Sequence, residues 1–561
     1  MQKGMLTTLM LSATLPLAAL AQTATDLKND ATTPTAVLTY GMGYGQQRFS
    51  PLKQINRDTV KRLVPAWSYS MASNIGLEGQ ALVKDGVIYM TDHNKTVAVD
   101  ALTGKEIWKS LQEYPPETTR IVCCGIENRG GALFDGKLYR TTLDAYVVAL
   151  DAKTGKEVWR TKSGELKDGY VMTGAPVIVD GVVMVGVAGA EYGHRGYIAG
   201  YDAWTGQEVW RTWTIPAPGE RGSETWPQNG TWKTGGGSTW LTGTYDPELN
   251  LVYWGTGNPA PHNPLNRPGD NLYTDCVLAM RPKTGEIVWY YQEMPNDPFD
   301  YDGVNELVLG DIKIDGAKHK VMMQAARNGY LYVLDRTNGK LLAANPYVKV
   351  NWADGIDLKT GRPVLSALTK ATISQRAEVT LWPSKTGGKN WQPMSFNPLT
   401  GLIYVNTNEI GWKYQPQPIE KAENLKVGQP FRAVDYSWVF EDPNTRGHLK
   451  AIDPATGEVK WSKPERSPNW SGTLVTAGSV VFTGQLTGEF IAVDADSGKT
   501  LWQFQMPSGV TSQPITWERD GKQYVTVASG TGGLYPANSG DTNIANVPAG
   551  SSLWTFKLFD E

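Results

Sequence analysis

A short phrase built around Asp-x-x-Thr-Gly recurs along the chain, and in most copies it ends in tryptophan. In such a phrase the aspartate accepts hydrogen bonds from the backbone just downstream and the glycine takes a positive φ, so the phrase predicts a tight turn. Apolar segments flank the turn on both sides. Each copy therefore predicts a β-hairpin, with a tryptophan at a fixed place. The seven copies begin at Asp100, Asp151, Asp202, Arg281, Asp335, Asp453 and Asp494.

Regular repetition on this scale is typical of solenoids and propellers. A tryptophan that docks between neighbouring sheets favours a propeller with blades of four antiparallel strands. The first three copies stand 51 residues apart and the last two 41. Seven copies, with a further blade closed by residues 63–67 and 553–558, predict an all-β, eight-bladed propeller. The 60 glycines, 21 tryptophans and 25 tyrosines agree with an all-β chain.

Two intervals between copies are longer than the others and indicate insertions. They follow Trp210 and residue 343, and they cover roughly residues 211–240 and 343–390. Because insertions in a repeat architecture map to loops on one face, we expect both to shape a binding site there.

The first 21 residues are typical of a secretory signal peptide. Lys3 supplies the positive end, residues 5–18 are mostly apolar, and Ala19-Leu20-Ala21 is an A-x-A cleavage site before Gln22. The apolar stretch is too short for a comfortable membrane span, and the polar residues after it disfavour an ordinary N-terminal helix. We expect a mature chain of residues 22–561, a single propeller domain without a membrane span, exported to the periplasm, where disulfides persist.

Charge and motif content exclude several functions. The net charge of −3 gives no reason to expect nucleic acid or an anionic membrane as a partner. No C-x-x-C-H motif occurs, so this chain carries no covalently attached c-type haem. No G-x-G-x-x-G stands between a strand and a helix, which disfavours nicotinamide chemistry. The five histidines do not group at zinc-ligand spacing: His93, His194, His262, His319 and His448.

Two of the three cysteines are adjacent, Cys123 and Cys124, and the third is Cys276, whose role stays open. A disulfide between neighbours closes a strained eight-membered ring, because ordinary disulfides hold their Cα atoms about 4.4–6.8 Å apart and a trans peptide about 3.8 Å. Such a bridge has little value as a staple, but a flat, rigid, apolar disulfide suits a lid over a flat ligand. Two adjacent buried thiols are the alternative.

Several local phrases are more specific than the repeats. They are residues 123–129, 189–191, 235–240, 255–261 (Gly-Thr-Gly-Asn-Pro-Ala-Pro), 300–305 (Asp-Tyr-Asp-Gly-Val-Asn), 327–329 and 390–393. With the repeats, they make the chain resemble the pyrroloquinoline quinone (PQQ)-dependent alcohol dehydrogenases of the methanol/ethanol type, over essentially the whole mature chain. The resemblance implies an eight-bladed propeller of the bacterial periplasm with PQQ as its cofactor.

The resemblance also implies two flat walls and a polar edge around PQQ. The Cys123-Cys124 bridge would cover one face and Trp240 would stack on the other, with packing between blades as the alternative role of Trp240. Arg129 and Arg327 would bind carboxylate or quinone oxygens, with a purely structural role as their alternative. The other positions that match the cofactor lining of the family are Glu78, Thr173, Gly189, Ala190, Asn390, Trp391 and Trp470.

The metal ligands that the resemblance implies are oxygen donors, Glu191, Asn258 and Asp300, which suit a hard cation. Asp302 adds another carboxylate. By the resemblance, aspartate here marks members that use a lanthanide (lanthanum, cerium, praseodymium or neodymium), whereas calcium enzymes usually have alanine or serine. A further carboxylate also favours a trivalent ion by Coulomb's law. The nearest alternative is a calcium enzyme of the same family, with Asp302 only capping the turn at Gly303.

The implied reaction is oxidation of a primary alcohol to an aldehyde with hydride transfer to PQQ. Asp300 would be the general base, with Glu191 as the alternative, and Arg327 would donate to a quinone oxygen. His262 stands where methanol-oxidising members have tryptophan, which favours ethanol and longer or aromatic primary alcohols. Electrons would pass to a separate, soluble c-type cytochrome. The oligomeric state stays open, a homodimer included, and a cofactor-free propeller scaffold is the alternative from a different class.

Overall fold

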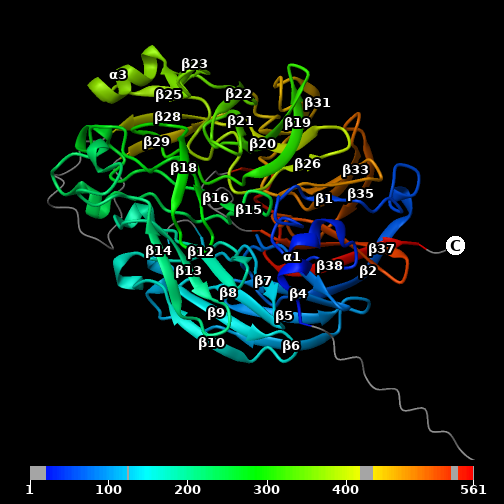
Figure 1. Ribbon diagram of the computed structural model, residues 1–561. Helices are drawn as coiled ribbons and strands as arrows, with labels where there is room; N and C mark the ends of the chain where they lie inside the picture. Colours follow the sequence, from blue (N-terminus) through cyan, green and yellow to red (C-terminus); the bar gives the residue numbers. More distant parts are fainter. Residues whose placement is uncertain (1–20, 123–124, 417–433, 532–540, 560–561) are drawn as a thin grey trace, which may run out of the picture.

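The computed structural model describes residues 21–122, 125–416, 434–531 and 541–559. Within these ranges the chain forms eight blades of four antiparallel strands, one of which carries a fifth, parallel strand, and this confirms the predicted all-β propeller (Figure 1). The α-helices of this part of the chain are short: α1 (Ala24–Asn29), α2 (Thr118–Ile121) and α3 (Ala367–Gln375). None of the described helices is both long and apolar enough to cross a membrane.

The strands of the first four blades pair in chain order. Blade 1 holds β3 (Leu82–Lys84), β4 (Val87–Asp92), β5 (Lys95–Asp100) and β6 (Glu106–Leu111); blade 2 holds β7 (Ala132–Phe134), β8 (Lys137–Thr141), β9 (Tyr146–Asp151) and β10 (Glu157–Lys162). Blade 3 holds β11 (Val177–Val179), β12 (Val182–Gly186), β13 (Tyr197–Asp202) and β14 (Glu208–Trp213); blade 4 holds β15 (Thr244–Asp246), β16 (Leu251–Gly255), β17 (Cys276–Met280) and β18 (Ile287–Gln292).

The other four blades follow the same plan. Blade 5 holds β19 (Val308–Ile314), β20 (Ala317–Ala325), β21 (Tyr330–Asp335) and β22 (Leu341–Pro346); blade 6 holds β26 (Ser395–Asn397), β27 (Leu402–Asn408), β30 (Gly447–Ile452) and β31 (Val459–Glu465). Blade 7 holds β32 (Leu474–Thr476), β33 (Val480–Gly484), β34 (Glu489–Asp494) and β35 (Thr500–Gln505), with β1 (Phe49–Ser50) parallel to β32. Blade 8 holds β36 (Ile515–Arg519), β37 (Lys522–Gly530), β38 (Ser551–Leu558) and β2 (Leu63–Ser70).

The eighth blade joins the two ends of the chain, as predicted. Strand β2 pairs antiparallel with β38, from Leu63 opposite Leu558 to Ser70 opposite Ser552. Figure 1 shows the blue β2 beside the red β37 and β38. The ring is therefore closed by backbone hydrogen bonds between segments that are almost 500 residues apart in the sequence.

The repeated tryptophan docks on the turn of the next blade. The indole of Trp108 donates to the carbonyl of Ala152 at 3.0 Å, and its ring covers the space where a side chain on Gly155 would lie. In the turns that begin with aspartate, this residue acts as expected: Asp100, for example, accepts from the backbone and hydroxyl of Thr103 at 2.9 and 2.8 Å. The same indole-to-carbonyl bond recurs for Trp67, Trp159, Trp210 and Trp461.

The apolar core lies between neighbouring sheets. One cluster runs through blades 1 to 4 and includes Tyr139, Tyr197 and Trp254. A second joins blades 1, 7 and 8 through residues such as Val97 and Phe490. The sheets are therefore held face to face by apolar burial, and their edges are free to carry loops.

The structure has three large insertions, whereas two were predicted. The first separates β14 from β15. The second separates β22 from β26 and holds the hairpin of β23 (Ala353–Asp357) and β24 (Arg362–Leu365), α3 and β25 (Val379–Leu381). The third, which the sequence did not reveal, interrupts blade 6 between β27 and β30. Its strands β28 (Gly411–Pro416) and β29 (Val434–Val439) form a small sheet with β25.

Candidate active site

A cavity of about 220 Å³ opens at one end of the propeller. In an antiparallel blade, the segment that enters the first strand and the loop between the second and third strands lie at the same end. The predicted site residues occur in these segments, in blade after blade, and so they converge. The predicted residues that line the cavity are Arg129, Thr173, Gly189, Glu191, Trp240, His262, Asp300, Asp302, Arg327, Asn390, Trp391 and Trp470.

Three predicted residues, Glu78, Ala190 and Asn258, are buried but do not form the cavity wall. The predicted disulfide of Cys123 and Cys124 lies outside the described residues. Val122 and Gly125, on either side of that pair, both line the cavity.

Arg129 is held between acidic and aromatic groups. Its Nη2 lies 2.8 Å from Glu78 Oε2 and 2.7 Å from Glu127 Oε2. Its guanidinium carbon lies 5.0 Å from the centre of the Trp240 ring and 5.4 Å from that of Trp391. Burial and the Glu127 carboxylate raise the pKa of Glu78 well above its ordinary value, although Arg129 opposes this. The cation is thus fixed rigidly at the edge of the cavity.

Arg327 connects the two acidic residues of the Asp-Tyr-Asp phrase. Its Nη2 lies 2.9 Å from Asp302 Oδ2, its Nη1 lies 3.5 Å from Asp300 Oδ1, and Nη1 donates to the carbonyl of Asp300 at 3.0 Å. Asp302 also accepts from the backbone N–H of Asn258 at 2.8 Å and from the indole of Trp240 at 3.2 Å. Asp302 is therefore bound by three other segments, which is more than capping its own turn requires.

Asp300 lies in an environment that favours its protonated form. Burial raises the pKa of its carboxyl well above the ordinary value; Arg327 opposes this, and the carboxylates of Asp302 and Glu191 raise it further. Its backbone has a φ of 64°, a left-handed conformation that is uncommon outside glycine and that occurs at functional sites. The mutual repulsion of these carboxylates would be relieved by a bound cation.

The oxygen atoms of the site fit a hard cation. Two buried ones, Asn258 Oδ1 and Asp300 Oδ1, accept no hydrogen bond within the described part of the chain. Across the same residues, no three His, Cys, Asp or Glu side chains gather closely enough to hold an ion by themselves. Since calcium and similar cations take about 6–8 oxygen ligands, a complete shell needs the amide oxygen of Asn258 and oxygens from a bound cofactor.

The cavity also fits a planar, anionic ring system. Two guanidinium groups lie close to the ring of Trp240, because Arg327 is 5.6 Å from its ring centre in addition to Arg129 at 5.0 Å. Trp391 and Trp470, whose ring centres are 6.3 Å apart, line the same space. Aromatic surface for stacking and fixed cations for carboxylates are the groups that a quinone tricarboxylate such as PQQ requires.

Several lining residues were not predicted. Trp412 and Tyr414 come from β28 in the third insertion, and the Tyr414 hydroxyl donates to the carbonyl of Pro298 at 2.5 Å. Phe299 packs edge-on against Tyr414, with ring centres 5.3 Å apart. Glu127 stands within the phrase that follows the two cysteines, so its position was visible in the sequence. The β28 residues had no such signal.

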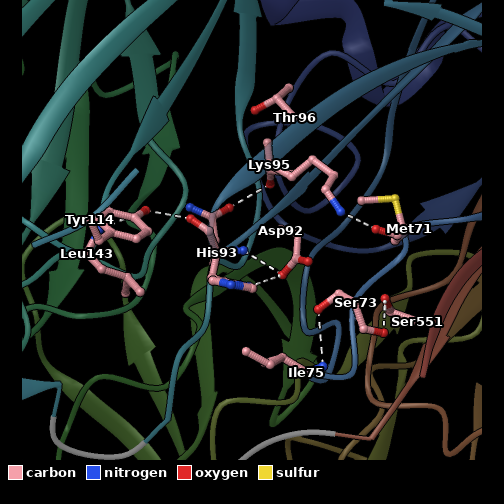
Figure 2. Close-up of polar contacts among 12 residues, drawn as sticks. Met71, Ser73, Ile75, Asp92, His93, Lys95, Thr96, Tyr114, Leu143 and Ser551 are labelled. Atoms are coloured by element: carbon pink, nitrogen blue, oxygen red, sulfur yellow. Dashed lines mark hydrogen bonds and ion pairs between the residues drawn. The ribbon is translucent and has the colours of Figure 1, made fainter. Parts of the chain in front are cut away.

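A second buried polar cluster lies on blade 1, and none of its residues lines the cavity (Figure 2). His93 Nδ1 lies 2.8 Å from Asp92 Oδ1, and the Tyr114 hydroxyl donates to the His93 carbonyl at 2.5 Å. Lys95 donates to the carbonyl of Met71, just beyond β2. The cluster therefore connects blade 1 with the segment that leaves the closing blade, and we interpret it as structural.

Comparison with known proteins identifies the family. Residues 38–351 and 367–525 match the PQQ family model described as "Glucose/ethanol/alcohol dehydrogenase, beta-propeller domain". The quinoprotein alcohol dehydrogenase PedH of Pseudomonas putida KT2440 is 40% identical over 559 residues, which cover 95% of this chain and 93% of PedH. A quinoprotein ethanol dehydrogenase of Pseudomonas aeruginosa PAO1 is 41% identical, covering 96% and 94%.

The chain belongs to the PQQ-dependent alcohol dehydrogenases. Among solved structures, a europium-containing methanol dehydrogenase superposes with a TM-score of 0.89 at 35% identity, covering 95% of this chain and all of that one. The predicted family and enzyme class are thereby confirmed. The alternative of a cofactor-free scaffold is wrong, because named dehydrogenases match nearly the whole chain. Membership of this family implies PQQ and a metal ion as cofactors.

Proposed function

We propose that this quinoprotein alcohol dehydrogenase uses a lanthanide ion and oxidises ethanol and longer or aromatic primary alcohols in the periplasm. The observation that carries the proposal is the position of Asp302. It adds a carboxylate to the cavity that Asp300 and Glu191 also line, and it is contacted by Trp240 and Arg327. A site with three carboxylates balances the charge of a trivalent ion and overcompensates that of calcium. Calcium is the second candidate.

We propose separate sets of residues as the binding groups for PQQ and for the metal ion. Trp240 offers a face for stacking, and Arg129 and Arg327 offer donors for carboxylate and carbonyl oxygens. The other cofactor-binding groups that we propose are Glu78, Thr173, Gly189, Ala190, Asn390, Trp391, Trp470 and a disulfide of Cys123 and Cys124. The proposed metal ligands are Glu191, Asn258, Asp300 and Asp302. When bound, PQQ supplies a two-electron acceptor and the metal ion the charge that polarises it.

Asp300 is the proposed general base. Its carboxyl lines the cavity, where it can accept the hydroxyl proton of a bound alcohol. Arg327, 3.5 Å from its Oδ1, stabilises the negative charge that the loss of this proton leaves in the site. Glu191 also lines the cavity and is the alternative base.

His262 supports the proposed substrate range. It lines the cavity with a smaller and more polar ring than the tryptophan of methanol-oxidising members. Phe299 and Trp412 add apolar surface to the same cavity, which suits a longer alkyl chain or an aromatic ring.

Export and electron transfer complete the proposal. Residues 1–21 would direct the chain to the periplasm and be removed there. The sequence has no C-x-x-C-H motif, so this chain offers no covalently attached c-type haem as an electron acceptor. A soluble c-type cytochrome is the proposed acceptor.

The test is to load the purified protein with PQQ and lanthanum and to record both its near-ultraviolet spectrum and its product. The expected result is a bound-quinone absorption band, and one aldehyde formed for each two molecules of a one-electron acceptor reduced. Ethanol, 1-butanol and benzyl alcohol should each have a higher kcat/KM than methanol. Preference for methanol would contradict the substrate range, and the lack of a bound quinone would contradict the cofactor assignment.

A further inference from the structure

The proposed metal ligands lie on loops that no sheet joins directly. Asn258 and His262 are in the loop that follows β16, and Asp300 and Asp302 are in the loop between β18 and β19. Both loops begin in blade 4, at the ends of strands that are not neighbours in its sheet. A metal site that uses both loops therefore depends on contacts between them, and the bond from the Asn258 backbone N–H to Asp302 at 2.8 Å is one such contact.

Arg267 bridges these two loops. Its side chain is fully buried, and its Nε donates to the carbonyl of Pro261 at 2.7 Å. Its Nη2 donates to the carbonyl of His262 at 3.1 Å and to the carbonyl of Asp297 in the other loop. One planar group thus contacts the two residues directly after the Asn-Pro-Ala segment and Asp297, three residues before Asp300.

The groups around Arg267 hold it in this orientation. Its Nη1 donates to Asn271 Oδ1 at 2.8 Å, and Asn271 Nδ2 donates back to the Arg267 carbonyl at 3.0 Å. The Asn296 amide also donates to that carbonyl at 3.0 Å. The Arg267 guanidinium is therefore fixed in place, because a planar group with this many hydrogen bonds has little rotational freedom.

Asp297 links Arg267 to the loop that carries Asp300. Its Oδ1 accepts from the backbone N–H of Phe299 and its Oδ2 from that of Tyr301, both at 2.7 Å. These two bonds enclose Asp300, whose backbone is left-handed at a φ of 64°. A single carboxylate therefore fixes the backbone on both sides of the proposed base, and Arg267 holds the backbone of that same aspartate.

We propose that Arg267 is a positioning residue that sets the distance between Asn258 and the Asp300–Asp302 pair, and so the affinity of the site for its metal ion. The inference rests on the proposed function of those residues as ligands. Arg267 does not line the cavity, so it acts through the loops and not by contact with the metal. Loss of a group that orients metal ligands commonly costs about 10–100-fold in metal affinity or activity.

The experiment is calorimetric titration of PQQ-loaded wild-type and Arg267→Lys protein with lanthanum chloride. Lysine keeps the positive charge but cannot reach all three loop carbonyls, so the Kd for lanthanum should rise by about tenfold or more. At saturating metal, kcat should also fall, because Asp300 is displaced, while KM for ethanol changes less.

Arg140 offers a matched control. It is likewise buried, and it donates to the carbonyls of Asp92, His93 and Lys95 in the blade 1 cluster of Figure 2, away from the cavity. Arg140→Lys should lower the melting temperature by a similar amount and leave the lanthanum Kd and kcat unchanged. An equal loss of metal affinity in both variants would show a general structural effect and overturn the proposal.

Three further outcomes distinguish the role of Arg267 from the proposed function. If Arg267→Lys does not fold, Asn271→Ala takes its place, since it removes one support of Arg267 and should weaken lanthanum binding by several fold; an unchanged Kd in that variant overturns the proposal. A wild-type protein that binds PQQ but neither lanthanum nor calcium would contradict the proposed function. If the wild type binds metal and Arg267→Lys binds it equally well, the role of Arg267 is contradicted and the proposed function is not.

Discussion

Asp300 combines three properties that suit a proton acceptor: burial, neighbouring carboxylates and a backbone held from both sides. Burial dominates the rise in its pKa, and Asp302 and Glu191 add to it. Asp300→Asn removes the proposed proton acceptor and the charge of a proposed metal ligand, so kcat should fall by about two decades or more. The measurement is steady-state kinetics with PQQ and metal in excess. Near-normal turnover would contradict the role of Asp300 and favour Glu191 as the general base.

Asp302 should decide which metal the enzyme uses. Its carboxylate accepts from Arg327, Trp240 and the Asn258 backbone, so an alanine removes a negative charge from the site together with these three contacts. Asp302→Ala should weaken activation by lanthanum by about tenfold or more, measured as the metal concentration that gives half-maximal rate. Unchanged metal preference would mean that Asp302 has only a structural role.

A buried carboxyl outside the site predicts a pH effect on stability. Burial raises the pKa of Glu293 from 4.5 to about 8. Between these values the unfolded chain is ionised while the folded chain stays protonated, so the free energy of unfolding falls as pH rises, by up to about 1.4 kcal/mol per pH unit. This component is fully present below pH 4.5 and absent above pH 8.

Glu293→Gln should remove this component, so the difference in melting temperature between pH 5.5 and 8 should be smaller than in the wild type. The exposed Glu286→Gln is the control and should behave as the wild type does. Equal pH dependence in all three proteins would contradict the buried, protonated state of Glu293.

Sequence reasoning worked for residues whose local phrase is distinctive. Trp240 was separated from the other tryptophans because it follows a glycine triplet outside the repeat, and it lies on the cavity wall. Arg267 and Asp297 were not predicted, because their contacts join loops about 30 residues apart and neither occurs in a recognisable phrase. Supporting residues of this kind become visible only when the loops are placed in space.

At the scale of elements, the repeat phrase locates hairpins and little else. It marks the turn between the third and fourth strands of a blade, so the hairpins of six copies carrying tryptophan could be predicted closely. The interval from Asp335 to Asp453 was interpreted as one insertion before blade 6. In the structure, β28 and β29 interrupt blade 6 after its second strand. The repeat phrase marks only the turn between the third and fourth strands, so it gives no sign of an insertion at that point.

The docking of tryptophan on the next turn can be tested with two glycines. Gly155 and Gly136 both have a φ of 70°, but a Cβ on Gly155 would clash with Trp108, whereas one on Gly136 would meet nothing within 4 Å. Gly136→Ala should cost about 1–2 kcal/mol for the left-handed backbone. Gly155→Ala should cost about 1–3 kcal/mol more, because the indole must move.

Denaturant unfolding of the two variants measures the difference. If Gly155→Ala is no less stable than Gly136→Ala, the indole does not depend on close contact with the turn, and the repeated tryptophan has a smaller part in joining blades than we infer.

At the scale of the whole molecule, closure of the ring creates the site. Strands β2 and β38 complete the eighth blade, and segments from blades 2 to 7 then meet at one end of the propeller. Each of these six blades contributes at least one lining residue, so no blade holds the site alone. The fold could be predicted because its sequence phrase repeats. The parts of the cavity wall that come from insertions could not be predicted, because the insertions have no repeated phrase.

The most direct test of the account is the activity of PQQ-loaded, metal-free wild-type enzyme with ethanol, titrated separately with lanthanum chloride and calcium chloride. Three carboxylates around one ion predict that lanthanum restores full activity, and that calcium alone gives less than about a tenth of that rate at any concentration. Full activity with calcium, and none added by lanthanum, would contradict the lanthanide assignment.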